Sequence, residues 1–133
     1  MPCHYVIDKE RRLVITTASG NVTFAEAMAH QDQLSRDPEF SQDFSQLLDA
    51  TTVSRLDLSA LQIRELARRR MFSATSRRAL VANNPAVFGV GRMLQTYLDL
   101  AKAEEKVAVF YSRSSALKWL GLENDPPAAG QSG

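Results

Sequence analysis

Two short runs rich in apolar residues lie near the start of the chain, separated by four charged residues. Residues 4–8 and 13–17 contain β-branched side chains in a pattern typical of strands, and the charged residues 9–12 suit an exposed turn. Gly20 and Asn21 then interrupt the pattern. The first twenty or so residues therefore predict two antiparallel strands joined by a hairpin.

Three later segments repeat apolar residues at helical spacing, and each opens with a capping signal. Thr23 and Ser59 are each followed three residues later by Glu or Gln, the spacing of a capping box. Asn84 precedes Pro85, which lacks the backbone donor that would be unsatisfied at the first helical position. We predict helices from these three signals, with the apolar face of the second reaching Met71 and the third helix the longest.

Short apolar runs separate the predicted helices. Residues 44–50, 79–82 and 107–111 have the length and composition of buried strands. We place the end of the third strand at residue 50 and predict a loop in the polar stretch 51–57. A last short helix follows the fifth strand, with Gly121 as its left-handed stop.

The predicted element order is ββαβαβαβα. Strands that alternate with helices imply right-handed crossovers and a mainly parallel sheet, whereas the hairpin makes the first strand antiparallel to the second. We therefore predict an α/β single domain over residues 1–122 with a mixed, mainly parallel five-stranded sheet. Residues 123–133 lack an apolar anchor and predict a disordered C-terminal tail.

Four segments carry motifs with the spacing found in one known group of proteins. They are residues 78–83, Phe-Gly-Val-Gly-Arg-Met at 88–93, Val-Ala-Val-Phe at 107–110, and Ala-Leu-Lys-Trp-Leu-Gly at 116–121. The residues Gly20, Thr23, Asp37-Pro38 and Leu48-Asp49 fit the same pattern. Over about residues 5–121 the chain resembles the STAS-like proteins with a SpoIIAA-like fold, in the uncharacterised branch found in many bacteria.

This resemblance implies helices packed mostly on one side of the sheet. Name-giving members of the group are anti-sigma-factor antagonists, which bind a kinase partner and are switched by phosphorylation of a serine at the start of the second helix. They carry Asp-Ser-Ser-Gly after the third strand, where this chain reads Asp-Ala-Thr-Thr, so a clear phosphoswitch motif is missing. A related fold group includes lipid-carrying domains, although no lipid-pocket motif matches here.

The segment after the third predicted strand supplies candidate switch or partner-binding residues. Asp49, Thr51 and Thr52 fall where a parallel strand is expected to end, the edge at which α/β sheets usually carry function, and Ser59 begins the next helix. A phosphate on these hydroxyls would create or disrupt a docking surface. The alternative is that Asp and Thr are ordinary turn residues that bond their own backbone.

The third predicted helix supplies a candidate anion- or ligand-binding site at Gly89, Gly91 and Arg92. Free N–H groups at the helix start favour an anion, but a phosphate-binding fingerprint would need a third glycine between strand and helix. The alternative is that the two glycines let the helix pack closely on the sheet or on another helix.

Charge is segregated along the chain although the net charge is only +1. Residues 55–78 hold seven basic and two acidic residues, a sum of +5, whereas residues 1–50 hold four basic and eight acidic ones, a sum of −4. The candidate basic surface is Arg64, Arg68 and Arg69, with Arg70, Arg77 and Arg78 nearby in sequence. It indicates an acidic partner or a phosphate-bearing ligand, or else a solvated helix face. Nucleic acid is not expected, because no aromatic side chains interleave with the arginines.

Reactive side chains form no catalytic or metal-binding pattern. Cys3, His4 and His30 lack the number and spacing of metal ligands, and we predict no enzyme, no cofactor and no metal site. The single cysteine rules out an intramolecular disulfide. The first twenty residues are too charged for a signal peptide and no apolar run is long enough to span a membrane, so we expect a cytoplasmic protein.

These observations leave two functional hypotheses. The first is a non-enzymatic protein-interaction or regulatory module resembling anti-sigma-factor antagonists, with an unidentified, acidic protein partner. The alternative is a small-molecule carrier that binds an amphipathic or anionic ligand between sheet and helices. A homodimer formed through the far end of the third helix, around Tyr97 and Leu98, is a further prediction.

Overall fold

The computed structural model describes residues 3–69, 71–101 and 106–122, and these residues form the nine predicted elements in the predicted order. The elements are β1 (Cys3–Asp8), β2 (Leu13–Thr23), α1 (Phe24–Arg36), β3 (Ser45–Asp57), α2 (Ala60–Arg68), β4 (Arg77–Ala82), α3 (Pro85–Leu100), β5 (Lys106–Phe110) and α4 (Arg113–Leu120). The predicted tail, 123–133, lies outside the described residues. No helix in the described ranges is long and apolar enough to cross a membrane.

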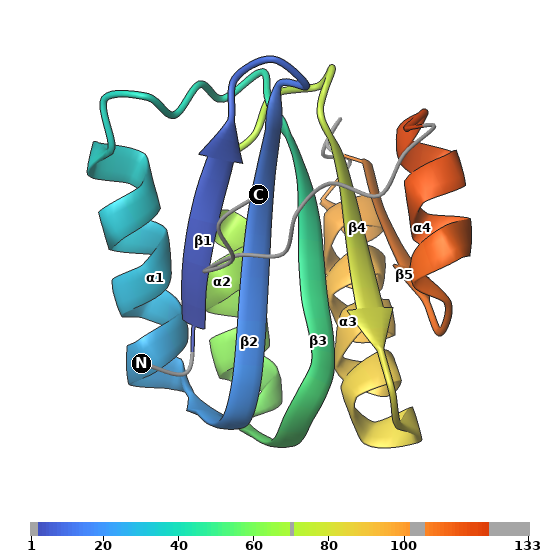
Figure 1. Ribbon diagram of the computed structural model, residues 1–133. Coiled ribbons are helices and arrows are strands. Elements are labelled where there is room, and N and C mark those ends of the chain that lie inside the picture. Colours follow the sequence, from blue (N-terminus) through green and yellow to red (C-terminus); the bar gives the residue numbers. More distant parts are fainter. Residues whose placement is uncertain (1–2, 70, 102–105, 123–133) are drawn as a thin grey trace.

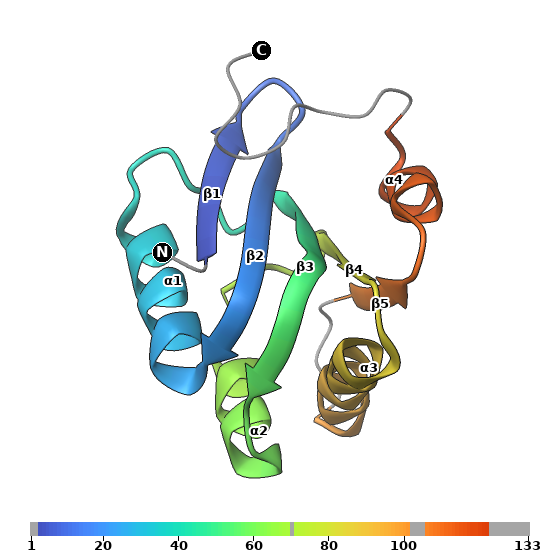
Figure 2. The ribbon, with the colours of Figure 1, turned by 60° about the horizontal axis from the view of Figure 1, so that its bottom comes forward.

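The five strands form one sheet in the order β1-β2-β3-β4-β5. β1 runs antiparallel to β2, and the remaining neighbours are parallel, which confirms the predicted mixed sheet. Helices α1, α2 and α3 cover one face of the sheet and α4 covers the other (Figures 1 and 2). The first three share a face because each connects neighbouring parallel strands by a crossover of the same hand.

Local capping signals fix where the helices start. Thr23 and Ser59 both form complete capping boxes, and the side chain of Asn84 accepts a hydrogen bond from the Val87 backbone N–H at 2.9 Å. Helix α4 ends at Gly121, whose φ of 79° is left-handed. One predicted helix boundary was wrong: α2 ends at Arg68, and Met71 packs against the core from the following loop.

Strands β2 and β3 are longer than their composition predicts. Instead of a loop over residues 51–57, β3 continues alongside β2 to the pair Thr23↔Asp57. The physical reason is that Val22 and Val53, at 4% and 3% exposure, bury one face of the extension, so polar residues on its other face do not end the strand. Gly20, with φ of 66°, lies at a register shift in this extension.

The two faces of the sheet have separate cores. On the α4 face, Leu13, Ile15 and Leu47 are almost fully buried and pack with Leu117. On the opposite face, the small residues Ala18, Ala50 and Ala82 pack with larger apolar residues of the strands and α3. Helices α1, α2 and α3 cover this second face, and the candidate site lies between them and the sheet.

Candidate functional site

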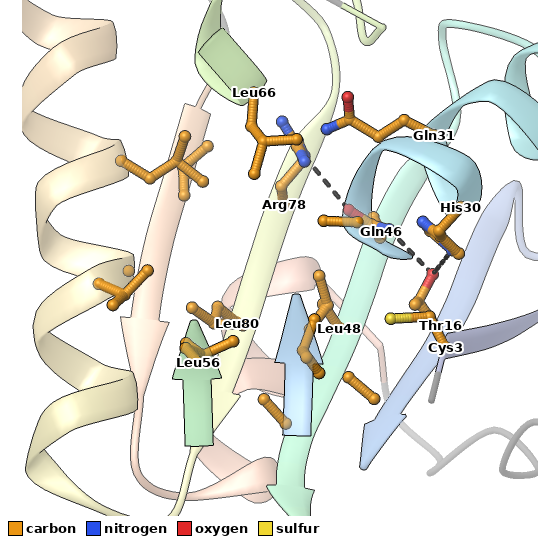
Figure 3. A pocket seen from close by; sticks show the side chains of 18 of the residues that line it. Cys3, Thr16, His30, Gln31, Gln46, Leu48, Leu56, Leu66, Arg78 and Leu80 are labelled. Atoms are coloured by element: carbon orange, nitrogen blue, oxygen red, sulfur yellow. Dashed lines mark hydrogen bonds between the residues drawn. The ribbon is translucent and has the colours of Figure 1, made fainter. Parts of the chain in front are cut away.

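The sheet and helices α1, α2 and α3 line a partly open cavity of about 160 Å³ (Figure 3). Apolar side chains from strands and helices make most of its wall, among them Leu48, Leu56, Ile63, Leu80, Val90 and Leu94. Leu48 and Leu80 belong to central strands and yet are only half-buried. Apolar cavities of about 150 Å³ accept a molecule the size of benzene.

The floor of the cavity changes from polar to apolar along strands β3 and β4. Alternate residues of a strand share a face, and the two strands are in register, so they present matched pairs to the helices. The successive pairs are Gln46↔Arg78, Leu48↔Leu80 and Ala50↔Ala82. One end of the floor is therefore polar and the other is made of leucine and alanine.

Four side chains at the polar end form a connected row, which we call the polar row: Thr16, His30, Gln46 and Arg78 (Figure 3). Arg78 Nε donates to Gln46 Oε1 at 3.2 Å, and Gln46 Nε2 donates to Thr16 Oγ1 at 2.9 Å. Thr16 Oγ1 lies 3.3 Å from His30 Nε2. Thr16 and Gln46 are 1% and 2% exposed, so these bonds satisfy polar groups that water hardly reaches.

The polar row has a positive charge at one end. The Arg78 guanidinium lies over the Phe72 ring, 4.6 Å from its centroid. Burial, and then the charge of Arg78, lower the pKa of His30 to about 4, so His30 is neutral at pH 7. Among the described residues that line the cavity, Arg78 has the one permanent charge.

Cys3 of β1 also lines the cavity (Figure 3). Burial raises the pKa of its thiol, and the negative charge of Glu26 adds to that increase. The thiol is therefore protonated and poorly nucleophilic at neutral pH. Within residues 3–69, 71–101 and 106–122, no three His, Cys, Asp or Glu side chains lie together in a way that could hold a metal.

The three candidate residues of α3 do not form one site. Gly91 is buried and lines the cavity, and a Cβ there would lie 2.5 Å from Leu80 Cδ2 and 2.7 Å from Val109 Cγ2. Gly89 and Arg92 are exposed, and a Cβ on Gly89 would meet no atom within 4 Å. Close packing of α3 on the sheet therefore accounts for Gly91 but not for Gly89.

The candidate switch residues lie within β3 and at the start of α2, rather than in a loop at the end of a strand. Asp49 Oδ1 accepts bonds from the Thr51 backbone N–H and hydroxyl, and Asp49 Oδ2 accepts one from Arg113 Nη1 at 2.8 Å. Thr52 donates to a β2 carbonyl at 3.2 Å. Ser59 is exposed and caps α2. Asp49 and Thr51 are thus brought together, joined by an arginine of α4 that sequence reasoning did not single out.

The arginines of α2 and of its C-cap, Arg69, make different contacts. Arg64 and Arg68 are exposed, and Arg68 pairs with Glu65 of the same helix at 2.9 Å. Arg69 instead forms an ion pair with Asp32 of α1 and so connects the two helices. The predicted basic surface is therefore divided between solvent and a helix–helix contact.

Arg77 and Arg78 point to opposite faces of the sheet, because neighbours in a strand alternate. Arg77 donates to the backbone oxygen of Trp119 at 2.7 Å and lies over its ring, whereas Arg78 enters the cavity on the other face. Arg70, also part of the predicted cluster, lies outside the described residues. The arginines near one another in sequence do not form one patch in space.

The C-terminal end of α3 was predicted to form a dimer surface, but one of the two predicted contact residues is buried in the core. Leu98 is 3% exposed and packs with Ala67 and Val107, so it belongs to the core of this protomer. Tyr97 packs against the same cluster. The predicted homodimer thus loses one of its two contact residues and stays a prediction.

Sequence reasoning did not predict the polar row. The sequence pattern placed the candidate residues at the carboxyl ends of the parallel strands, whereas Gln46 and Arg78 lie near the amino ends of β3 and β4. One signal could have revealed Gln46, which is a polar residue followed directly by two leucines in a predicted buried strand. Thr16 gives no such signal, because threonine is common in strands.

One solved structure is similar to this arrangement over nearly the whole chain. It is a crystal structure of an uncharacterized protein from the DUF3478 family of Shewanella loihica PV-4, described as having a SpoIIAA-like fold. The match has a TM-score of 0.56 and covers 89% of this chain and 93% of that chain. This chain has a SpoIIAA-like fold.

The comparison confirms the fold expected from the sequence motifs. Sequence identity to the Shewanella protein is 18%, so the SpoIIAA-like fold is shared and a function is not assigned by the match. No protein-family model matches the sequence, and no curated protein matches it either. Function therefore has to be argued from the cavity and its residues.

Proposed function

We propose that the protein is a non-enzymatic binding protein that holds a small, amphipathic molecule between its sheet and helices α1 to α3. The observation that carries this proposal is the apolar cavity of about 160 Å³ with the polar row at one end. An occupant would remove the half-buried Leu48 and Leu80 from water, which favours binding by roughly 25 cal/mol per Å² of apolar surface covered. The proposal assigns the carrier hypothesis to this cavity.

Filling the cavity tests the proposal. Ala27 lines the cavity from α1, whereas Ala29 is exposed on the same helix. We expect Ala27→Leu to abolish the binding of 1-hexanol in isothermal titration calorimetry, because the added side chain occupies the ligand's space. Ala29→Leu makes the same chemical change outside the cavity and should bind 1-hexanol as the wild type does. Absence of binding to the wild type, or equal binding to both variants, would contradict the proposal.

A second candidate function is the protein-interaction module. The observation in its favour is the outer face of α2, where Leu61 is 73% exposed and Arg64 and Arg68 follow it at helical spacing. An acidic partner would complement these two charges. A partner that the wild type captures should be lost with Leu61→Asp and retained with Met93→Asp, a change at an exposed residue of α3. Equal capture by both variants would exclude this face.

A further inference from the structure

We propose that a ligand enters and leaves the cavity between α1 and α2, and that the ion pair between Arg69 and Asp32, which we call the latch, holds this entrance closed. The inference rests on the proposed binding function and adds the route by which the cavity is reached. It is carried by the packing between the helices, by the residues that line the cavity on either side of the entrance, and by the contacts of Arg69.

The two pairs of neighbouring helices are packed differently. Ala67 of α2 and Leu98 of α3 belong to one apolar cluster, against which Leu94 and Tyr97 of α3 also pack. Within the described residues, no apolar cluster contains a residue of α1 together with a residue of α2. Since burial of apolar surface is the main attraction between packed elements, α1 separates from α2 more readily than α3 does.

Helix α1 is the part of the cavity wall with the least buried apolar surface. Of its residues, all of which the structure describes, Leu34 alone is buried. The other side chains that α1 presents to the cavity are Ala27, His30 and Gln31, which are small or polar. Segments with few buried apolar contacts open locally at a lower free energy than the rest of a protein. We therefore expect α1 to be the helix that moves.

The boundary between α1 and α2 lies over the cavity. Gln31 of α1 and Leu66 of α2 both line the cavity, and both are half-buried, so solvent also reaches them. Figure 3 shows these two side chains on the helix side of the cavity, at the same end as Arg78. Separation of α1 from α2 would therefore admit a molecule to the cavity without unpairing any strand.

Arg69, the C-cap of α2, bridges this boundary with polar contacts. One of its guanidinium nitrogens pairs with Asp32, and the other lies 3.4 Å from both the Met28 carbonyl oxygen and the Gln31 side-chain oxygen. The hydrogen bonds that the described residues form between α1 and α2 with its C-cap all come from Arg69. Both side chains of the latch are partly exposed, at 31% and 41%, so dissolved salt screens it.

Loss of the latch should change how fast the cavity exchanges its ligand rather than how tightly it binds. The latch closes over the empty and the occupied cavity alike, so its removal raises the rates of association and dissociation by the same factor. The ordinary strength of an exposed ion pair corresponds to a factor of up to about five in the population of the open state.

Line-shape analysis of methyl NMR signals during a titration with 1-hexanol measures both rates. We expect Arg69→Ala to raise both of them about two- to fivefold, with a change of less than about twofold in Kd. Arg68→Ala is the matched control, because Arg68 pairs with Glu65 of its own helix, and it should leave both rates unchanged. Arg69→Lys keeps the positive charge and should give rates close to those of the wild type.

A series of salt concentrations provides a second measurement. Because 1-hexanol is uncharged, electrostatic steering does not contribute to its association rate. The ratio of the association rate of Arg69→Ala to that of the wild type should fall toward one as sodium chloride is raised from about 20 mM to about 500 mM. This ratio cancels the effect of salt on the solubility of 1-hexanol.

The outcomes separate this inference from the proposed function. If the wild type does not bind 1-hexanol, the proposed function itself is wrong. If it binds, but Arg69→Ala leaves both rates unchanged or Arg68→Ala raises them equally, the entrance is elsewhere and the cavity remains a binding site. A change in the dissociation rate alone, with a matching change in Kd, would also overturn the inference, because Arg69 would then stabilise the bound state rather than the closed entrance.

Discussion

Thr16 and Gln46 determine how the polar end of the cavity is built. Each is almost fully buried, and each bonds to the other as well as to one further member of the polar row. Removing one partner leaves the other polar group buried and unsatisfied, which costs about 1–3 kcal/mol. The row therefore behaves as a unit that holds Arg78 in place.

Thr16→Val tests this dependence. The valine keeps the shape of the side chain but removes the oxygen that accepts the bond from Gln46 Nε2. We expect the free energy of unfolding in urea to fall by about 1–3 kcal/mol. Thr96→Val on the exposed surface of α3 is the control and should change it by less than about 0.5 kcal/mol. Equal effects of the two variants would mean that the polar row does not stabilise the fold.

His30 gives the stability of the protein a dependence on pH. Burial and the nearby Arg78 lower its pKa from 6.5 to about 4 in the folded state. The unfolded chain therefore binds the proton more readily, and the stability present above pH 6.5 is lost as the pH falls toward 4.

His30→Gln should flatten this dependence. Because one pKa unit corresponds to about 1.4 kcal/mol, the His30 contribution lost by pH 4 is up to about 3 kcal/mol. Urea unfolding between pH 4 and 7 measures the effect, and His4→Gln, a change at an exposed histidine, should keep the wild-type slope. The same slope in His30→Gln as in the wild type would show that His30 is not the group responsible.

The helices and the strands differ in how far their boundaries could be predicted. Caps such as Thr23 and Ser59 act on backbone groups within three residues, so the sequence alone locates the helix starts. The end of β3 depends on its pairing with β2 far away in sequence, and a polar composition over residues 51–57 could not reveal that pairing. The candidate residues Asp49, Thr51 and Thr52 were misplaced for this reason.

One exposed arginine, at the C-cap of α2, contacts α1. Arg69 pairs with Asp32, and its other nitrogen lies 3.4 Å from the side-chain oxygen of Gln31, which lines the cavity. An exposed ion pair of this kind contributes about 0.2–1 kcal/mol. We expect the loss of this ion pair to affect mainly how readily α1 and α2 separate.

Arg69→Ala should therefore cost little stability but speed the exchange of backbone amide hydrogens in α1. We expect a loss of at most about 1 kcal/mol in the free energy of unfolding. Arg68→Ala is the matched control, since its partner Glu65 is on the same helix and α1 should exchange as in the wild type. Unchanged exchange in Arg69→Ala would mean that other contacts hold the two helices together.

The sheet packs closely against α4 on one face, whereas the space between the sheet and helices α1 to α3 on the other face is incompletely filled. The cavity leaves Leu48 and Leu80 partly exposed to water although both belong to inner strands, and exposed apolar surface opposes stability by roughly 25 cal/mol per Å². Loss of stability at a functional site is a known compromise in proteins. A ligand that fills the volume would recover part of this stability.

At this scale the sequence predicted the fold but not the site. Motifs and element order led to the SpoIIAA-like fold, because they reflect local spacing and chain topology. The cavity depends on how three helices lie over the sheet, including the close approach of α3 at Gly91. Arg78 was recognised only as one of several arginines, because its distance from Gln46 follows from the pairing of two strands.

The most direct test of the account is a methyl NMR titration with 1-hexanol. We predict chemical-shift changes at Leu48, Leu80 and Leu94 around the cavity, and unchanged signals at Leu13 and Leu47 on the α4 face. Changes of equal size on both faces, or none at saturating 1-hexanol, would contradict the claim that this cavity binds an amphipathic molecule.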